Sequence, residues 1–253
     1  MTQAHPAGTL YLIPTALADP FIPDATLPRT AQALLARLDY FIVENAKSAR
    51  HFLKTVGTAL PLQSLEMREL NEHTAETALQ DLLEPIANGR DAGLISEAGA
   101  PAVADPGANL VALAHRSGVA VQPVVGPSSI LLALMASGLN GQSFAFQGYL
   151  PADRPGRLKA LAELERESAA KHMTQIFIET PYRNDALFAD IMATCAADTI
   201  VCVATQLTAP DQSIATRTVG KWRAVRTELG KRPTVFLLLA PSHAPARKGG
   251  LRP

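Results

Sequence analysis

Apolar residues in the first half of the chain form short continuous runs, separated by segments in which they recur at helical spacing. The runs that predict buried strands lie at residues 9–13, 40–43, 92–95 and 119–125. Apolar positions at helical spacing lie at 27–38, 46–56, 74–86, 109–116 and 130–137. Strands that alternate with helices in this way predict an α/β domain over residues 1–140.

The same alternation starts again after residues 138–142, which we interpret as a linker. Further strands are predicted at 144–150, 175–178, 199–204, 214–219 and 235–239, and helices at 155–170, 187–192 and 221–229. Residues 65–73 are polar and give no clear signal. We therefore predict a second α/β domain over 141–240, with each domain built on a mixed sheet flanked by helices. A tail at 241–253 is predicted to be disordered.

One stretch, LISEAGAPAVADPG at residues 94–107, passes directly from a buried strand into a loop of small and acidic residues. It contains Gly99 and Gly107, two prolines, and the carboxylates Glu97 and Asp105. Open α/β sheets bind ligands at the carboxyl ends of their strands. An ordinary connection is the alternative, but an ordered loop of this composition favours a functional role.

A second strand-to-helix junction follows at Gly126, Pro127, Ser128 and Ser129. It has glycine in the turn and hydroxyl groups at the start of an apolar helix. The first N–H groups of a helix have no partner within the helix, and the helix dipole is positive there. The junction therefore suits a carboxylate or another polar ligand group.

The charge balance argues against a global nucleic-acid-binding surface, because Lys plus Arg and Asp plus Glu both total 23. Any RNA contact must then be local. The candidate cations lie on the predicted helix and in the tail: Arg154, Arg157, Lys159, Arg166, Lys171, Arg247, Lys248 and Arg252. Because Glu163, Glu165 and Glu167 interleave with the helical cations, a solvated helix face is the alternative.

The two cysteines, Cys195 and Cys202, match no zinc spacing, and we predict no metal site. We expect both to be reduced thiols in the cytosol. No apolar run reaches the length of a membrane span, and the N-terminus has no pattern of a signal peptide. We therefore expect a cytoplasmic protein without a membrane partner.

Several motifs together resemble the tetrapyrrole methylase superfamily of S-adenosylmethionine-dependent methyltransferases. They are LYLIPT, Glu44, LISEAGAPAVADPG, VVGPSS, FQGYLP, IETPYR and RPTVFLLL, and they cover roughly residues 9 to 240. Within the superfamily, the chain is most similar to the branch of the small-subunit ribosomal RNA cytidine 2′-O-methyltransferase, as a divergent paralogous subgroup. The central motif keeps the pattern of that branch, with Glu97 in place of Asp and Ala100 in place of Thr.

Three further departures lie around the substrate site that the resemblance implies. The first loop continues as Ala16-Leu17-Ala18-Asp19, where the ribosomal RNA enzymes have Pro-Ile-Gly-Asn. Glu44 is followed by Asn-Ala-Lys in place of Asp-Thr-Arg, and Thr-Pro-Tyr-Arg at 180–183 replaces Ser-Pro-His-Arg. The resemblance therefore supports binding of the methyl donor more strongly than it supports the identity of the methyl acceptor.

The resemblance implies S-adenosylmethionine as the cofactor, held in a cleft between the two domains. The implied donor contacts in the first half are Thr15, Ser96, Glu97, Ala98, Gly99, Val103, Ala104 and Ser128. The implied donor contacts in the second half of the chain are Ser129, Pro181, Leu207, Pro233 and Thr234. This set offers the N–H donors, hydroxyls, acid and apolar slot that such a ligand needs.

Glu44, Asp105 and Glu179 each follow or neighbour a predicted buried strand, and each is a candidate general base for a hydroxyl acceptor. The alternative for each is a structural acid bonded to loop amides. Arg183 could hold a phosphate or pair with Glu179.

The resemblance implies a homodimeric methyltransferase that acts on an RNA ribose 2′-hydroxyl. Two alternatives stay open. The neutral charge and altered first loop favour a small-molecule acceptor of the tetrapyrrole kind. Loss of the first-loop glycine favours a non-catalytic protein that binds the donor or RNA.

Overall fold

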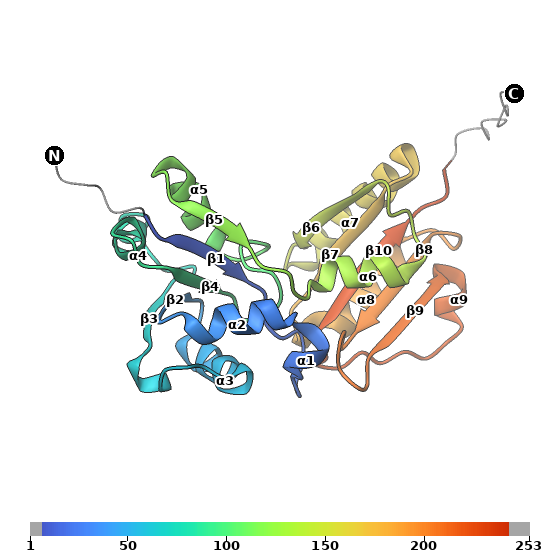
Figure 1. Cartoon of the computed structure of the whole chain (residues 1–253). Coiled ribbons are helices and arrows are strands. Elements are labelled where there is room, and N and C mark those ends of the chain that lie inside the picture. The colour runs from blue at the N-terminus through green and yellow to red at the C-terminus, as the bar shows by residue number, and fades with distance from the viewer. Residues whose placement is uncertain (1–6, 243–253) are drawn as a thin grey trace, which may run out of the picture. The chain divides into compact units, whose positions relative to one another are not determined.

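The computed structural model describes residues 7–242, and the chain divides into two compact units, Met1–Ser128 and Ser129–Pro253 (Figure 1). Each unit contains one five-stranded sheet with helices packed against it. The predicted α/β class with two domains is confirmed. Most of the predicted tail, including Arg247, Lys248 and Arg252, lies outside the described residues.

The sheet of the first unit is entirely parallel, in the order β3-β2-β4-β1-β5. Its strands are β1 (Thr9–Ile13), β2 (Tyr40–Val43), β3 (Glu66–Glu69), β4 (Ala92–Ile95) and β5 (Ala120–Pro123). The mixed sheet predicted here is therefore not found, because every connection between these strands is a crossover that returns the chain in the same direction. The 3-10 helix η1 (Leu62–Ser64) and β3 occupy the segment that gave no clear signal.

Helices cover both faces of this sheet. They are α1 (Pro23–Thr26), α2 (Arg29–Arg37), α3 (Ala46–Val56), α4 (Ala78–Ala87) and α5 (Gly107–Arg116). On one face, Leu35 of α2 and Phe52 of α3 pack into a core with Phe41. On the other face, Leu83 of α4 and Leu110 of α5 pack on a separate core. Burying each such side chain is worth about 1.5–3 kcal/mol, so both faces hold the sheet in place.

The start of α4 differs from the sequence-based expectation of a helix capped by Thr74. The helix begins at Ala78, and the Thr74 hydroxyl oxygen instead accepts a 2.9 Å bond from the N–H of Asn71. A threonine hydroxyl can close a turn as readily as it caps a helix, and here it closes the turn that precedes α4.

The second unit contains a mixed sheet, as predicted, and its strand order is β6-β7-β10-β8-β9. Its strands are β6 (Phe144–Tyr149), β7 (Thr174–Ile178), β8 (Ile200–Thr205), β9 (Ser213–Thr218) and β10 (Thr234–Leu239). Only β6 and β7 pair in parallel, and the other three pairings are antiparallel. Its helices are α6 (Ser129–Ser137), α7 (Arg154–Lys171), η2 (Pro181–Arg183), α8 (Asn184–Thr194) and α9 (Val219–Arg223).

The core of the second unit includes Trp222, whose indole N–H donates to the carbonyl of Val201 at 2.9 Å. Phe177 and Phe236 stack at 5.9 Å from neighbouring strands. Cys195 and Cys202 are buried free thiols, and burial raises the pKa of Cys195 to about 12. No helix within residues 7–242 is long and apolar enough to cross a membrane.

Helix α6 belongs to the second unit, so the division at 128/129 lies before the predicted boundary at residue 140. The helix packs on β8, β9 and β10, and the Thr216 hydroxyl donates to the carbonyl of Ser137 at 2.7 Å. Because α6 is apolar around most of its circumference, its sequence pattern does not indicate which sheet it covers.

Candidate functional site

The carboxyl ends of β1 and β4 form the topological switch of the parallel sheet. The two strands are neighbours, but the chain leaves them in opposite directions, toward β2 after β1 and toward β5 after β4. The two loops meet directly, since the N–H of Thr15 donates to the carbonyl of Gly99 at 2.9 Å. The Thr15 hydroxyl also donates to the carbonyl of Ser96 at 3.2 Å. A crevice at such a point is where open α/β sheets bind ligands.

The loop after β4 holds an unusual backbone conformation. Gly99, Ala102 and Ala104 have positive φ values of 73°, 65° and 63°. For alanine this conformation costs about 1–2 kcal/mol per residue, and such strain gathers at functional sites. The loop therefore needs a strong internal support.

Asp105 supplies that support. Its two carboxylate oxygens accept from the N–H of Ala102 at 2.8 and 3.0 Å, and Oδ1 accepts from the N–H of Gly107 at 2.7 Å. Burial raises the pKa of Asp105 against these hydrogen bonds, and the nearby Glu44 carboxylate adds to the rise. These contacts match the structural alternative for Asp105, an acid bonded to loop amides.

Glu44 lies at the carboxyl end of β2, beside the same loop. Its Oε2 accepts from the N–H of Glu97 at 3.0 Å, and Oε1 of Glu97 accepts from the hydroxyl of Ser48 at 3.5 Å. Glu44 is half-buried and Glu97 is exposed. The edge thus combines two carboxylates with the hydroxyls of Thr15 and Ser96, although these residues come from three separate parts of the sequence.

Two departures from the ribosomal RNA branch are accommodated without loss of local structure. Asn45 caps α3, because its Oδ1 accepts from the N–H groups of Lys47 at 2.9 Å and Ser48 at 3.2 Å. Asn and Asp are equally good caps, so this exchange keeps the helix start. Ala18 stands where the ribosomal RNA enzymes have glycine, and its φ is not positive. The first loop therefore forms without the glycine.

A cavity of about 170 Å³ opens beside this edge, within the first unit. It is lined by Thr15, Ala16, Ala18, Asp19, Phe21, Ser48, Ala49, His51, Phe52, Thr55, Ile95, Ser96 and Glu97. The rings of Phe21 and Phe52 approach to 5.3 Å between centroids. The sequence predicted Thr15, Ser96 and Glu97 here but not the contributions of Phe21 and His51, which depend on how α3 packs.

The remaining donor residues predicted in the first unit lie on the same loop or at the end of the unit. Ala98, Val103 and Ala104 are exposed, and Ser128 is the last residue of the unit. Ser129 begins α6 of the second unit.

Apart from Ser129, the predicted donor residues of the second unit lie at one edge of its sheet. In the antiparallel pairings, Ile178 of β7 and Thr205 of β8 lie opposite the first two residues of β10. Pro181, Leu207 and Thr234 therefore come from adjoining strand ends, and the N–H of Gln206 donates to the carbonyl of Pro233 at 2.9 Å. Residues far apart in the sequence are brought together here.

Glu179 is buried at this edge and paired with Arg183, which was one of the two predicted roles of that arginine. Oε1 accepts from Arg183 at 2.6 and 3.0 Å and from the N–H of Thr180 at 2.6 Å. Asn184 donates from Nδ2 to the carbonyl of Arg232 at 2.7 Å. Among the described residues, the buried side-chain oxygens without a partner are Glu179 Oε2 and Asn184 Oδ1. Asn184 was not predicted, because its burial follows from the loop that covers it.

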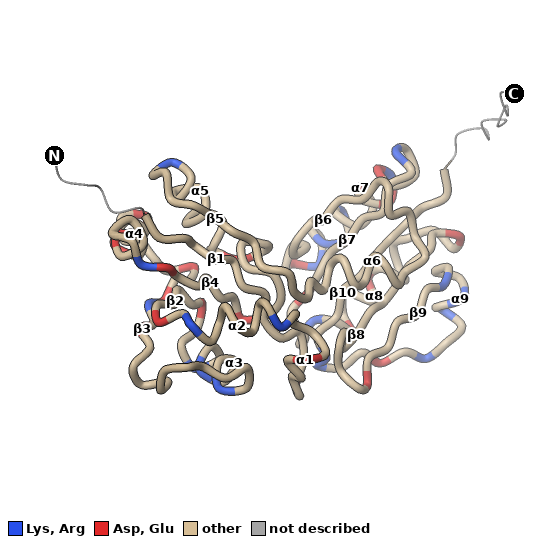
Figure 2. Tube along the Cα trace, viewed as in Figure 1, with Lys and Arg blue, Asp and Glu red and all other residues tan. Residues whose placement is uncertain are grey.

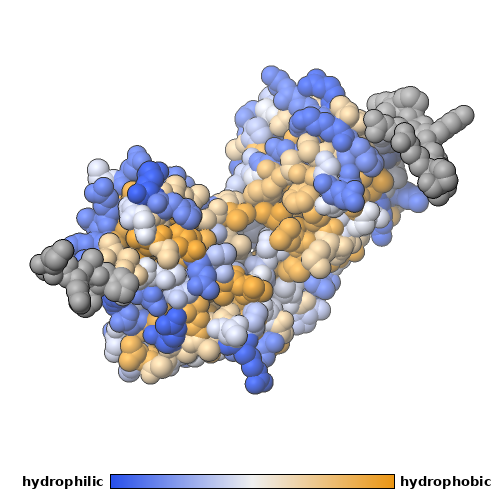
Figure 3. Space-filling view, turned by 45° about the horizontal axis from the view of Figure 1, so that its top comes forward, coloured by the Kyte–Doolittle hydropathy of each residue, from blue (hydrophilic) through white to orange (hydrophobic). Residues whose placement is uncertain are grey.

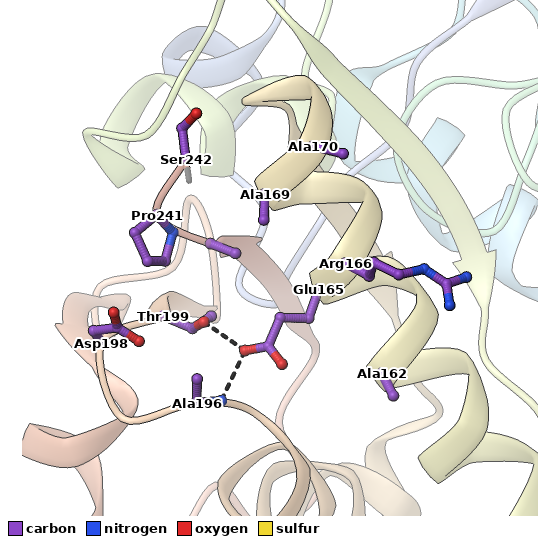
Figure 4. Close-up of a pocket in the computed structure, with 11 residues that line it drawn as sticks. Ala162, Glu165, Arg166, Ala169, Ala170, Ala196, Asp198, Thr199, Pro241 and Ser242 are labelled. Carbon is purple, nitrogen blue, oxygen red and sulfur yellow. Dashed lines mark hydrogen bonds between the residues drawn. The ribbon is translucent and has the colours of Figure 1, made fainter. Parts of the chain in front are cut away.

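A larger cavity of the second unit, about 500 Å³, lies elsewhere, between α7, the segment around Ala196 and the end of β10 (Figure 4). Of the two carboxylates that line it, Glu165 points toward Thr199 and accepts from that hydroxyl at 2.5 Å and from the N–H of Ala196 at 2.8 Å. The lining contains none of the predicted donor or catalytic residues. The volume of a cavity alone therefore does not identify the candidate functional site.

Among the α7 cations predicted to contact RNA, Arg154, Lys159, Arg166 and Lys171 are exposed, whereas Arg157 is buried. Arg157 is 5% exposed and binds Asp190 through Nε at 2.8 Å and Nη2 at 2.6 Å. Arg154 also binds Asp190 at 2.9 Å, and Lys171 pairs with Glu167 at 2.5 Å. Although burial opposes it, the hydrogen bonds from Arg154 and Arg157 hold the pKa of Asp190 below its usual range. Arg157 is therefore a core ion-pair residue, which a helical charge pattern cannot reveal.

Comparison with known proteins agrees with the family resemblance found in the sequence. Residues 10–222 match the family of Tetrapyrrole (Corrin/Porphyrin) Methylases. Among curated proteins, the ribosomal RNA small subunit methyltransferase I of Halalkalibacterium halodurans is 35% identical over 72% of this chain and 58% of that protein. The protein of the same name from Vibrio cholerae is 31% identical over 84% of this chain and 69% of that protein.

Among solved structures, the methyltransferase CobJ has a similar fold, with a TM-score of 0.61 at 19% identity. The match covers 96% of this chain and 98% of that one. The chain spans less than two thirds of the Halalkalibacterium relative, whereas it matches CobJ along nearly its whole length.

Proposed function

The chain belongs to the tetrapyrrole methylase family, and on that basis we propose that it is an S-adenosylmethionine-dependent methyltransferase whose acceptor is a ribose 2′-hydroxyl of RNA. The observation that carries the proposal is the strained loop 96–107, supported by Asp105 and bonded to Thr15 at the switch of a parallel sheet. The similarity to curated proteins named as ribosomal RNA methyltransferases supports RNA as the acceptor.

We propose that the donor is bound by Thr15, by the backbone and side chains of 96–99, and by Val103 and Ala104. Ser128 and Ser129 add hydroxyl and N–H groups. Pro181, Leu207, Pro233 and Thr234 of the second unit supply further donor contacts. Methyl transfer from a sulfonium needs chiefly alignment of donor and acceptor, which is worth roughly 7–11 kcal/mol. A loop held rigidly by several hydrogen bonds suits this requirement.

Glu44 is the carboxylate whose geometry best suits a general base. The oxygens of Asp105 are engaged by loop amides, and Glu179 is buried against Arg183. Glu44 is half-buried at the edge, with one bond from the N–H of Glu97. In the proposed step, the acceptor oxygen bonds to the methyl carbon as the carbon–sulfur bond breaks. Glu44 takes the hydroxyl proton, and the demethylated donor leaves.

A small-molecule acceptor is the second candidate function. It is favoured by the balanced total charge and by the limited cavity of about 170 Å³ beside the altered first loop. The non-catalytic alternative was favoured by the lost glycine of the first loop, and Ala18 at that position is not among the non-glycine residues with positive φ.

Two measurements test the proposal. Calorimetry should show binding of S-adenosylmethionine and of its demethylated product to the folded protein, and no binding of either would contradict it. With labelled donor, the label should enter bulk RNA. Label found only in metabolite extracts would replace the RNA acceptor with a small molecule, and donor binding without transfer would indicate a non-catalytic protein.

We further propose that the protein acts as a homodimer in the cytoplasm, where ribosomal RNA would be its substrate. Exposed apolar side chains on the second unit, including Leu131 and Met135 of α6, support a protein contact. Figure 3 shows orange, apolar surface on this unit, at the right of the view. Light scattering should give the mass of a dimer, and replacement of Met135 by Lys should shift it toward that of a monomer.

A further inference from the structure

We propose that the outward face of α3 is the surface that holds the phosphates of the acceptor RNA. The inference rests on the proposed RNA-methylating function and assigns its contact to the first unit instead of α7. Lys47, Arg50 and Lys54 are exposed on α3, with His51 among them. Figure 2 shows the Lys and Arg positions of this helix in blue.

The charge on α3 is of one sign. Residues 46–56 contain no Asp or Glu. Arg50 and Lys54 are four residues apart, and like charges at this spacing destabilise a helix by about 0.2–0.5 kcal/mol per pair. Lys47 also lies in the first helical turn, where the dipole disfavours a cation. A helix that keeps such charges against its local stability is typical of an anionic ligand surface.

The α3 cations have no internal partner that would account for them. Within residues 7–242, no carboxylate lies within ion-pair distance of Lys47, Arg50 or Lys54. Arg50 makes one long contact of 3.5 Å to the carbonyl of Ala46, one turn earlier. The three charges are therefore available to phosphate oxygens, which Lys and Arg commonly bind.

The same helix borders the cavity beside the candidate site. Ser48, His51, Phe52 and Thr55 of α3 contribute to its lining, and Phe21, which also lines it, packs against Phe52 with 5.3 Å between ring centroids. A strand whose phosphates lie on the outer face of α3 would have a base within reach of this partly aromatic cavity. Glu97 and Asp19 also line it and repel phosphate, but carboxylates accept hydrogen bonds from base amino groups. The arrangement separates a phosphate side from a base side.

The test compares two triple variants of the full chain that remove the same charge. Lys47→Gln, Arg50→Gln and Lys54→Gln change α3, and Lys159→Gln, Arg166→Gln and Lys171→Gln change α7. Binding of a labelled single-stranded RNA is measured by anisotropy over a series of salt concentrations. Each phosphate contact on a single strand contributes about −0.7 to the slope of log affinity against log salt. The α3 variant should therefore lose about 2 from the magnitude of the slope, and the α7 variant should match the wild type.

Donor calorimetry on both variants should give the wild-type affinity. An α3 variant with the wild-type salt slope, or two variants with equal losses, would overturn this inference while leaving RNA methylation intact. A wild type that neither binds nor methylates RNA would instead contradict the proposed function. A tetrapyrrole polycarboxylate serves as a second probe, and α3-dependent binding of that probe without RNA binding would overturn the RNA assignment.

Discussion

The buried ion pair of the second unit and the candidate site of the first unit place charged side chains in different surroundings. In the second unit, the buried Asp190 pairs with the buried Arg157, and the buried Glu179 pairs with the half-buried Arg183. In the first unit, the carboxylates Asp105 and Glu44 accept from backbone N–H groups of a loop, and the cations of α3 stay at the surface. The two pairs of the second unit therefore stabilise its fold, whereas Asp105, Glu44 and the α3 cations shape and surround the candidate site of the first unit.

The largest effect is expected from Glu44→Gln, which tests whether an acid of the first unit does chemistry. A positioned general base contributes about 10²–10⁴-fold, so kcat should fall by that factor. The side-chain carbonyl oxygen of the introduced glutamine can still accept from the N–H of Glu97, and donor affinity by calorimetry should be unchanged. The matched control, Glu179→Gln in the second unit, should lower stability more than kcat. The reverse pattern would assign the base to Glu179.

Asp190→Ala tests whether the second unit depends on its buried pair. The change leaves Arg157 buried without its carboxylate, and breaking such a pair costs about 3–5 kcal/mol of unfolding free energy. Chemical denaturation measures it. As a control, Lys171→Ala breaks an exposed pair on the same helix as Arg157 and should leave the transition in place. Equal denaturation midpoints for Asp190→Ala and Lys171→Ala would contradict a structural role for the pair of Asp190 with Arg157.

The same pair also sets a pH dependence. The pKa of Asp190 in the folded protein is lower than the usual value of 3.8. Its stabilising contribution is therefore complete above the unfolded pKa and is lost as the pH falls through the lower folded pKa. The stability difference between wild type and Asp190→Asn should shrink as the pH falls from neutral to below 3.8.

Asp105→Ala should have an intermediate effect, because it removes the support of a strained loop. Two backbone N–H groups, of Ala102 and Gly107, lose their acceptor, at about 1–3 kcal/mol each if they stay buried. Donor affinity should fall at least tenfold by calorimetry. Asp105→Asn keeps an acceptor oxygen and should recover part of the affinity. If both variants instead kept the donor and lost only kcat, Asp105 would be the base.

Gly99→Ala should have the smallest effect on the fold and a selective one on the donor. With φ of 73°, alanine costs about 1–2 kcal/mol, and its Cβ would lie 3.1 Å from the Leu17 side chain of the first loop. Gly118, with φ of 71° and open space, is the matched control. Both variants should lose similar stability, but only Gly99→Ala should weaken donor binding. Equal donor affinities would place the donor away from this loop.

Local patterns in the sequence were sufficient to locate the described strands other than β3, most helices and the junctions that carry the candidate site. Apolar runs and helical spacing are local properties, so β1, β2, β4 and α3 could be located without tertiary information. The loop 96–107, Thr15 and Glu44 were predicted as site residues because motifs and strand ends are also local. The bounds of the elements shifted by a few residues where several cap positions compete, as at the start of α4.

The partners that these residues meet depend on tertiary packing. Sheet order, the entirely parallel first sheet and the placement of α6 follow from contacts between segments far apart in the sequence. Arg157 and Lys47 look alike in sequence as helical cations, but Arg157 lies against Asp190, 33 positions away, and Lys47 faces outward. Burial and pairing are properties of the packed chain, and they decide whether a charge stabilises the fold or remains available to a ligand.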